Sequence, residues 1–198
     1  MIYTYLAYVP LPDDLEDRLD QYTKDLKNDY LDVLSVPRLT AHVTLMRMDC
    51  EAADEATITE GLEAIDHDPV EFTPVEAEKY SQSALALTMD DEDDIHALHK
   101  KIAEVFANKQ AQGPGRVKPK NQDRYDTIQR LGSPYFGDYY TPHMTVGYTG
   151  DDLDDLDDDL PLPRDINHDI RFEATEFVLS RKEQGSGRPY EEVGRYDL

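Results

Sequence analysis

Two short stretches of the chain share one pattern: Thr40-Ala41-His42-Val43-Thr44-Leu45 and Thr141-Pro142-His143-Met144-Thr145-Val146. In each stretch, threonine and histidine side chains alternate with small or apolar ones. Such alternation is typical of a β-strand, because successive side chains point to opposite faces. We therefore predict two strands, each presenting a histidine and a threonine side by side on one face and apolar side chains on the other.

The two copies lie 101 residues apart, which two unrelated strand histidines do not explain. They resemble the paired His-x-Thr/Ser-x motifs of the two-histidine (2H) phosphoesterases, a superfamily that includes the 2′-5′ RNA ligase-like proteins and several 2′,3′-cyclic phosphodiesterases. The first copy continues to Arg47, as in the extended His-x-Thr-Leu-x-Arg form of the motif. The second continues to Gly147 and Tyr148 and lacks that arginine.

The remaining segments predict an α+β chain, because short links between successive strands favour antiparallel pairing. Strands are predicted at 2–9, around His42, at 70–77, 84–89, 170–180 and 190–196, and helices from Asp13 onward, at 51–66 and around 95–105. Pro74 suggests that the strand carrying it lies at a sheet edge. The segment 116–140, rich in basic and then aromatic residues, is predicted to be irregular.

The resemblance implies a particular arrangement of these elements. It implies one domain over residues 1–198, built as two pseudo-symmetric lobes with two antiparallel sheets and flanking helices. Each lobe then presents one motif to a central cleft.

The charge of the chain limits its partners. A formal net charge of −23, from 43 acidic and 20 basic residues, repels long polyanions, so binding to duplex DNA is not expected. A salt-adapted host would produce the same composition.

With no membrane-spanning window and no signal-like start, we expect a cytoplasmic monomer. The single cysteine, Cys50, receives no chemical role.

Two histidines on facing strands can perform acid–base chemistry at phosphorus. The unperturbed pKa of histidine is about 6.5, so one imidazole can act as a base while the other acts as an acid. Thr44 and Thr145 are candidates for binding the phosphoryl oxygens. In the 2H family the first-motif histidine, here His42, is usually given the acid role. The mechanism requires no metal and no cofactor.

Four further residues are candidate substrate ligands: Arg47, Arg130, Tyr140 and Tyr190. Arg47 lies at an odd offset from His42, so it would point to the opposite face unless the strand bends or ends first. The basic stretch 116–130 either lines the cleft or forms a solvated loop. The aromatic residues 135–140 either stack a base or pack in the core.

Two other groups invite a metal interpretation. His96 and His99 lie three apart on a predicted helix, where a solvated helix face is the preferred interpretation over a shared metal. The acidic run 151–160 lacks the central glycine and closing glutamate of a calcium loop, so it is predicted to form a surface helix.

The resemblance implies hydrolysis of a 2′,3′-cyclic or 2′-5′ phosphodiester of an RNA end or a small nucleotide, and the two-histidine chemistry would perform it without a metal. Two alternatives stay open. One is an enzyme that cleaves another cyclic nucleotide, an oligonucleotide or ADP-ribose 1″,2″-cyclic phosphate. The other is a non-catalytic module that binds RNA ends or nucleotides.

Overall fold

The computed structural model describes residues 1–29, 34–35, 42–81, 84–90, 93–111, 122–133, 135–149 and 171–198. The acidic run 151–160 and the basic residues between 116 and 120 lie outside these ranges, so their predicted roles stay predictions.

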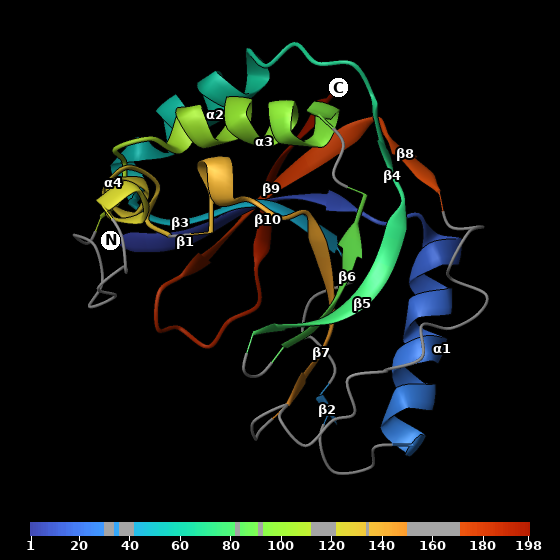
Figure 1. Ribbon diagram of the computed structural model, residues 1–198. Helices are drawn as coiled ribbons and strands as arrows, with labels where there is room; N and C mark the ends of the chain where they lie inside the picture. The colour runs from blue at the N-terminus through green and yellow to red at the C-terminus, as the bar shows by residue number, and fades with distance from the viewer. Residues whose placement is uncertain are drawn as a thin grey trace.

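One large antiparallel sheet holds most of the strands (Figure 1). Its order is β10-β9-β1-β3-β7-β6-β5, with the short β2 pairing with β7, and a second sheet consists of β4 and β8. The bounds are β1 Ile2–Pro10, β2 Leu34–Ser35, β3 His42–Glu51, β4 Val70–Phe72, β5 Pro74–Ser81, β6 Ala84–Met89, β7 His143–Thr149, β8 Phe172–Ala174, β9 Glu176–Glu183 and β10 Glu191–Asp197.

Helices flank the large sheet. They are α1 Asp13–Asp29, η1 Ala52–Asp54, α2 Glu55–Glu63, α3 Asp93–Phe106, α4 Gln122–Leu131 and η2 Gly137–Tyr139. In Figure 1, α2 and α3 lie together over one side of the β1, β3 and β9 region, while α1 lies away from them and contacts β7. The predicted α+β class with two antiparallel sheets is confirmed, although the two sheets differ greatly in size.

Two predicted strands each divide into two. The 70–77 segment breaks at Thr73 into β4 and β5, and the 170–180 segment breaks at Thr175 into β8 and β9. In both cases the first part joins the small sheet and the second joins the large one. β5 ends the strand order of the large sheet, so the edge position suggested by Pro74 is confirmed.

The prediction of irregular structure for 116–140 was wrong over α4. Ile128 and Leu131, three residues apart, are both buried, as expected for one face of a helix. Gly132 follows at a φ of 76°, and its N–H donates to the Ile128 carbonyl at 2.9 Å. A glycine in the left-handed conformation is a common helix end, and it was the sequence signal for this helix.

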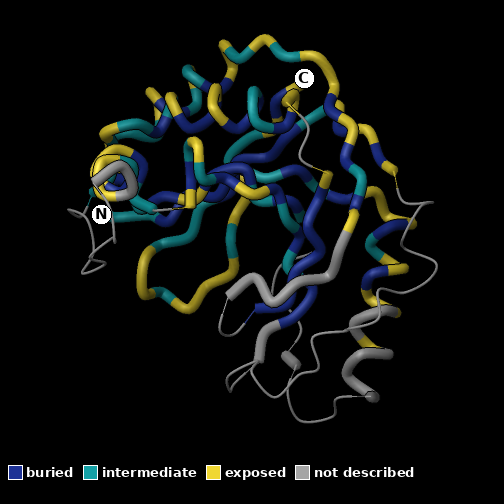
Figure 2. Tube along the Cα trace, viewed as in Figure 1, coloured by how far each residue is buried: buried dark blue, intermediate teal, exposed yellow. Residues whose placement is uncertain are grey.

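The core lies between the large sheet and the α2–α3 pair. Figure 2 shows buried residues along the central strands and along the inner sides of these helices. Fully buried side chains come from both layers, among them Leu45, Met46, Ile58, Ile95 and Leu98. Within the described ranges, no helix is long and apolar enough to cross a membrane.

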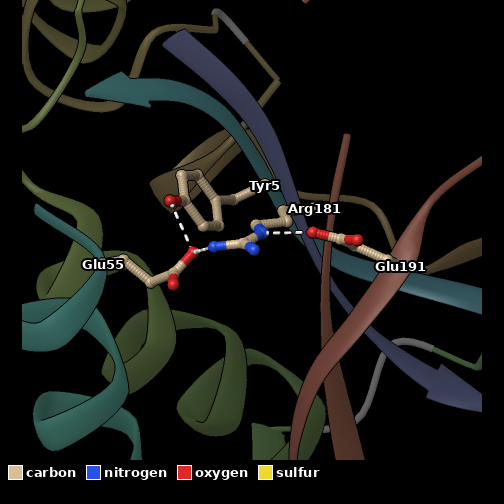
Figure 3. A network of polar contacts seen from close by, with 4 residues as sticks. All are labelled: Tyr5, Glu55, Arg181 and Glu191. Atoms are coloured by element: carbon tan, nitrogen blue, oxygen red, sulfur yellow. Dashed lines mark hydrogen bonds and ion pairs between the residues drawn. The ribbon is translucent and has the colours of Figure 1, made fainter. Parts of the chain in front are cut away.

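A polar network fixes α2 to the sheet (Figure 3). The Tyr5 hydroxyl donates to Glu55 Oε2 at 2.9 Å, and Arg181 binds the same carboxylate through Nη1. The Arg181 Nε also donates to Glu191 at 2.7 Å. The carboxylate of Glu55 therefore connects the first residue of α2 with β1 and β9, and Arg181 extends the connection to β10.

The strands that carry the motifs, β3 and β7, are neighbours. From β3 outward come β1, β9 and β10, and from β7 outward come β6 and β5. The motif strands thus lie at the middle of one continuous sheet. The division into two pseudo-symmetric lobes stays a prediction.

Candidate active site

The antiparallel pairing of β3 with β7 brings the two motifs together. Val43 pairs with Met144, and continuing this register places His42 opposite Thr145 and Thr44 opposite His143. Val43 and Met144 are fully buried, whereas the four flanking residues are partly exposed. All four polar side chains therefore lie on one face, where directly opposite Cβ atoms are about 4.5–5.5 Å apart.

A pocket of about 390 Å³ opens on this face and includes Thr44, His143 and Thr145. His42 is not among the lining residues, but it lies near enough to His143 to lower the pKa of that residue. The rest of the lining comes from β3, from Gln110 and from the segment after α4: Arg47, Met48, Asp49, Gln110, Gly132, Ser133, Tyr135, Phe136 and Tyr140.

The backbone fixes the tautomer of His143. Its Nδ1 lies 2.9 Å from the Thr141 carbonyl oxygen, which only accepts, so Nδ1 carries the proton. In the neutral ring Nε2 then carries the lone pair. Burial lowers the pKa of His143 below 6.5, and the neighbouring His42 lowers this pKa further. These features suit a base at neutral pH.

Tyr8 lies against the other histidine. Its ring makes an edge contact with the His42 ring, at 5.1 Å between centroids and 66° between planes. In the register of β1 with β3, Tyr8 pairs with Thr44. Sequence reasoning missed Tyr8, because nothing in the sequence indicates which strand adjoins the first motif.

A β-bulge in β3 brings Arg47 to the site. Tyr8 pairs with Thr44 and Ala7 pairs with Met46, so Leu45 is the extra residue. Beyond it the alternation shifts by one position, and Arg47 and then Asp49 are the more exposed residues. Arg47 accordingly lines the same pocket as Thr44 despite its odd offset from His42.

β7 has a bulge at the same place in its motif. Leu85 pairs with Gly147 and Ala86 with Thr145, so Val146 is the extra residue. The two motif strands therefore share both their residues and their irregularity.

The other three candidate ligands lie in different places. Tyr140 is buried and lines the pocket, and its hydroxyl donates to the Thr44 carbonyl at 2.9 Å. Arg130 lies in the last turn of α4, pairs with Glu104 and lines a separate depression. Tyr190 lies under the Lys182 ammonium, 4.9 Å from its ring centroid. Neither Arg130 nor Tyr190 lines the pocket.

The expectation that His99 lies on a solvated helix face was wrong. His99 is fully buried; its Nδ1 donates to the Leu45 carbonyl at 2.7 Å and its Nε2 accepts from the Gly137 N–H at 2.8 Å. Burial lowers its pKa from 6.5 to about 4. The sequence signal was its spacing, four residues after Ile95 and three before Ile102, on the apolar stripe of α3.

Metal ligands do not cluster in the described part of the chain. Among the residues that the structure describes, no three His, Cys, Asp or Glu side chains gather closely enough to hold a metal ion. Catalysis without a metal stays a prediction.

Comparison with known proteins identifies the family. A model of the 2′-5′ RNA ligase superfamily matches residues 11–186, so the chain belongs to this superfamily. Comparison with curated proteins by sequence gives no match.

Solved structures share the fold. Escherichia coli LigT complexed with phosphate has a TM-score of 0.69 at 15% identity, covering 100% of this chain and 98% of LigT. The Thermus thermophilus protein TT0787 has a TM-score of 0.63 at 13% identity, covering 98% of this chain and 97% of its own. Kluyveromyces marxianus Usb1 has a TM-score of 0.50 at 12% identity, covering 100% of this chain and 98% of Usb1. The family and the fold together indicate a 2H phosphoesterase.

The buried His99 makes a prediction about stability. In the unfolded chain its pKa is about 6.5, whereas in the folded protein it is about 4. Between these values the unfolded state binds the extra proton, so the free energy of unfolding falls as the pH drops from about 6.5 to about 4. Urea titrations across this range should show a smaller fall for His99→Gln than for the wild type. Carboxylates contribute equally to the pH dependence of both proteins. An equal fall in the free energy of unfolding of the two proteins would therefore contradict the lowered pKa assigned to His99.

Proposed function

We propose that this protein hydrolyses 2′,3′-cyclic or 2′-5′ phosphodiesters of RNA ends or nucleotides, using His42 and His143 as an acid–base pair without a metal. The observation that carries the proposal is the antiparallel pairing of Val43 with Met144, which brings the two motifs side by side, with Thr44, His143 and Thr145 lining one pocket. In-line displacement at phosphorus needs a base on the entering oxygen and an acid on the departing one.

The surroundings of the two histidines favour distinct roles. The partly exposed His143, whose pKa is lowered, accepts the proton of the attacking water through Nε2, because its Nδ1–H is bound to the Thr141 carbonyl. His42 donates a proton to the oxygen that leaves phosphorus. The edge contact with the Tyr8 ring helps to hold the His42 ring in place. One P–O bond forms and one breaks, leaving a phosphomonoester and a free hydroxyl.

Charge on the phosphoryl oxygens needs further stabilisation. Acid–base catalysis contributes about 10²–10⁴-fold, less than most enzymatic rate enhancements require. Thr44 and Thr145 supply hydroxyl donors from the same face as the histidines, and Arg47 supplies a cation from the pocket wall. A guanidinium binds phosphate oxygens with charge-assisted hydrogen bonds.

The pocket beyond the motifs suits a nucleoside. Tyr135 lines it with 57% of its surface exposed, so its ring is accessible for stacking on a base. LigT has been crystallised with 3′-AMP, ATP and NADP+, which supports a nucleotide ligand here. Another cyclic nucleotide, an oligonucleotide, ADP-ribose 1″,2″-cyclic phosphate, or nucleotide binding without turnover stay alternatives.

The first test is hydrolysis of 2′,3′-cyclic nucleotides after exhaustive EDTA treatment. Turnover should persist, and His42→Ala and His143→Ala should each reduce kcat by about 10²–10⁴-fold. Chromatographic separation of the cyclic and linear products measures the rate.

A matched control is His67→Ala, which removes a histidine outside the pocket, in the loop between α2 and β4. This variant should keep wild-type activity. Retention of full activity by both motif variants would exclude the acid–base pair. Tight nucleotide binding without turnover in the wild type would favour the binding module.

The pH profile of kcat/KM tests the assignment of roles. A base acts in its neutral form, so with His143 as the base activity rises as the pH increases through its lowered pKa. The acidic limb therefore lies below about 6.5. If His143 were the acid, activity would instead fall as the pH rises through that value. Loss of the acidic limb in His42→Ala, with that limb retained in His143→Ala, would contradict the assignment.

A further inference from the structure

The bulge at Leu45 exposes backbone groups of β3 that side chains then bind. A bulge interrupts the strand ladder, and buried carbonyls at such a site need other donors. Two consecutive carbonyls receive side-chain donors here. The Tyr140 hydroxyl donates to Thr44 O at 2.9 Å, and His99 Nδ1 donates to Leu45 O at 2.7 Å.

These two donors form one rigid unit. The rings of His99 and Tyr140 are stacked, with 3.9 Å between centroids and 10° between planes. The Gly137 N–H binds His99 Nε2, which fixes the tautomer that donates to Leu45. Both rings are buried, so neither donor can exchange readily with water. The unit joins α3 and the segment around η2 to the bulge.

The bulge decides which face Arg47 occupies. In a regular strand, residues five apart point to opposite faces, and Arg47 would then point away from His42. The opposite face is covered by the core, where an unpaired guanidinium is costly to bury. With the bulge, Arg47 lines the pocket beside Thr44, His143 and Thr145.

We propose that His99 and Tyr140 are positioning residues of the active site, which hold the Leu45 bulge so that Arg47 faces the bound phosphate. The kinetic consequences rest on the proposed function. The effect on phosphate binding does not rest on the proposed function, since it requires only that Arg47 and the motifs bind an oxyanion. Neither ring takes a proton from the substrate or gives it one.

The test is a double-mutant cycle between Tyr140 and Arg47, read by calorimetric titration with inorganic phosphate. Tyr140→Phe keeps the stacked ring and removes one hydrogen bond, so it should weaken phosphate binding about 3- to 10-fold. In an Arg47→Ala background the same substitution should change affinity less than about 2-fold, because the group that the bulge positions is absent. His99→Gln should show the same dependence on Arg47.

Tyr125→Phe is the matched control. Tyr125 is an exposed tyrosine of α4 outside the pocket, and its substitution should leave phosphate affinity unchanged in both backgrounds. Equal losses from Tyr140→Phe in the two backgrounds, or no loss in either, would overturn the proposal. A wild-type protein that binds no phosphate would also overturn the proposal. If the double-mutant cycle gives the expected result but the wild type does not hydrolyse cyclic substrates, only the proposed function is refuted.

Discussion

The antiparallel pairing of Val43 with Met144 is the constraint on which the site depends. It joins the middles of two motifs that are 101 residues apart in the chain. Because side chains alternate along a strand, one buried apolar pair sets two histidine–threonine pairs on the other face. A slip of one residue would bury the histidines and expose the apolar residues, so the core itself stabilises the functional register.

Around this pair, the two histidines have different surroundings. His143 is bound through Nδ1 to a backbone carbonyl, and partial burial lowers its pKa. His42 instead lies against the ring of Tyr8 from the neighbouring β1. In the β6–β7 register, Ala86 pairs with Thr145 as Tyr8 pairs with Thr44. The two copies of the motif thus have different surroundings because the strands beside them differ.

Local patterns predicted much of this arrangement. The alternation around His42 and His143 predicted the strands and the shared face correctly, because strand geometry is a local property. The apolar spacing of α3 was likewise visible in the sequence. His99 is buried because it lies on the apolar stripe of α3, although its imidazole is polar.

Features that depend on tertiary contacts were beyond prediction. The two carbonyls at the Leu45 bulge receive donors from His99 and Tyr140, which lie 54 and 96 residues from the residues they bind. Because the sequence does not reveal the bulge, it could not show on which face of β3 Arg47 lies. Arg130 was selected for its charge, but its partner Glu104 lies on another helix. The divisions at Thr73 and Thr175 arise from the small second sheet, whose strands are remote in sequence.

A crystal structure with orthovanadate, which imitates the five-coordinate state of in-line displacement, tests the central claim most directly. The account predicts vanadate on the shared face of β3 and β7, with His143 Nε2 and a ring nitrogen of His42 within hydrogen-bond distance of opposite apical oxygens. Vanadate bound away from these strands, or contacting only one of the two imidazoles, would contradict it.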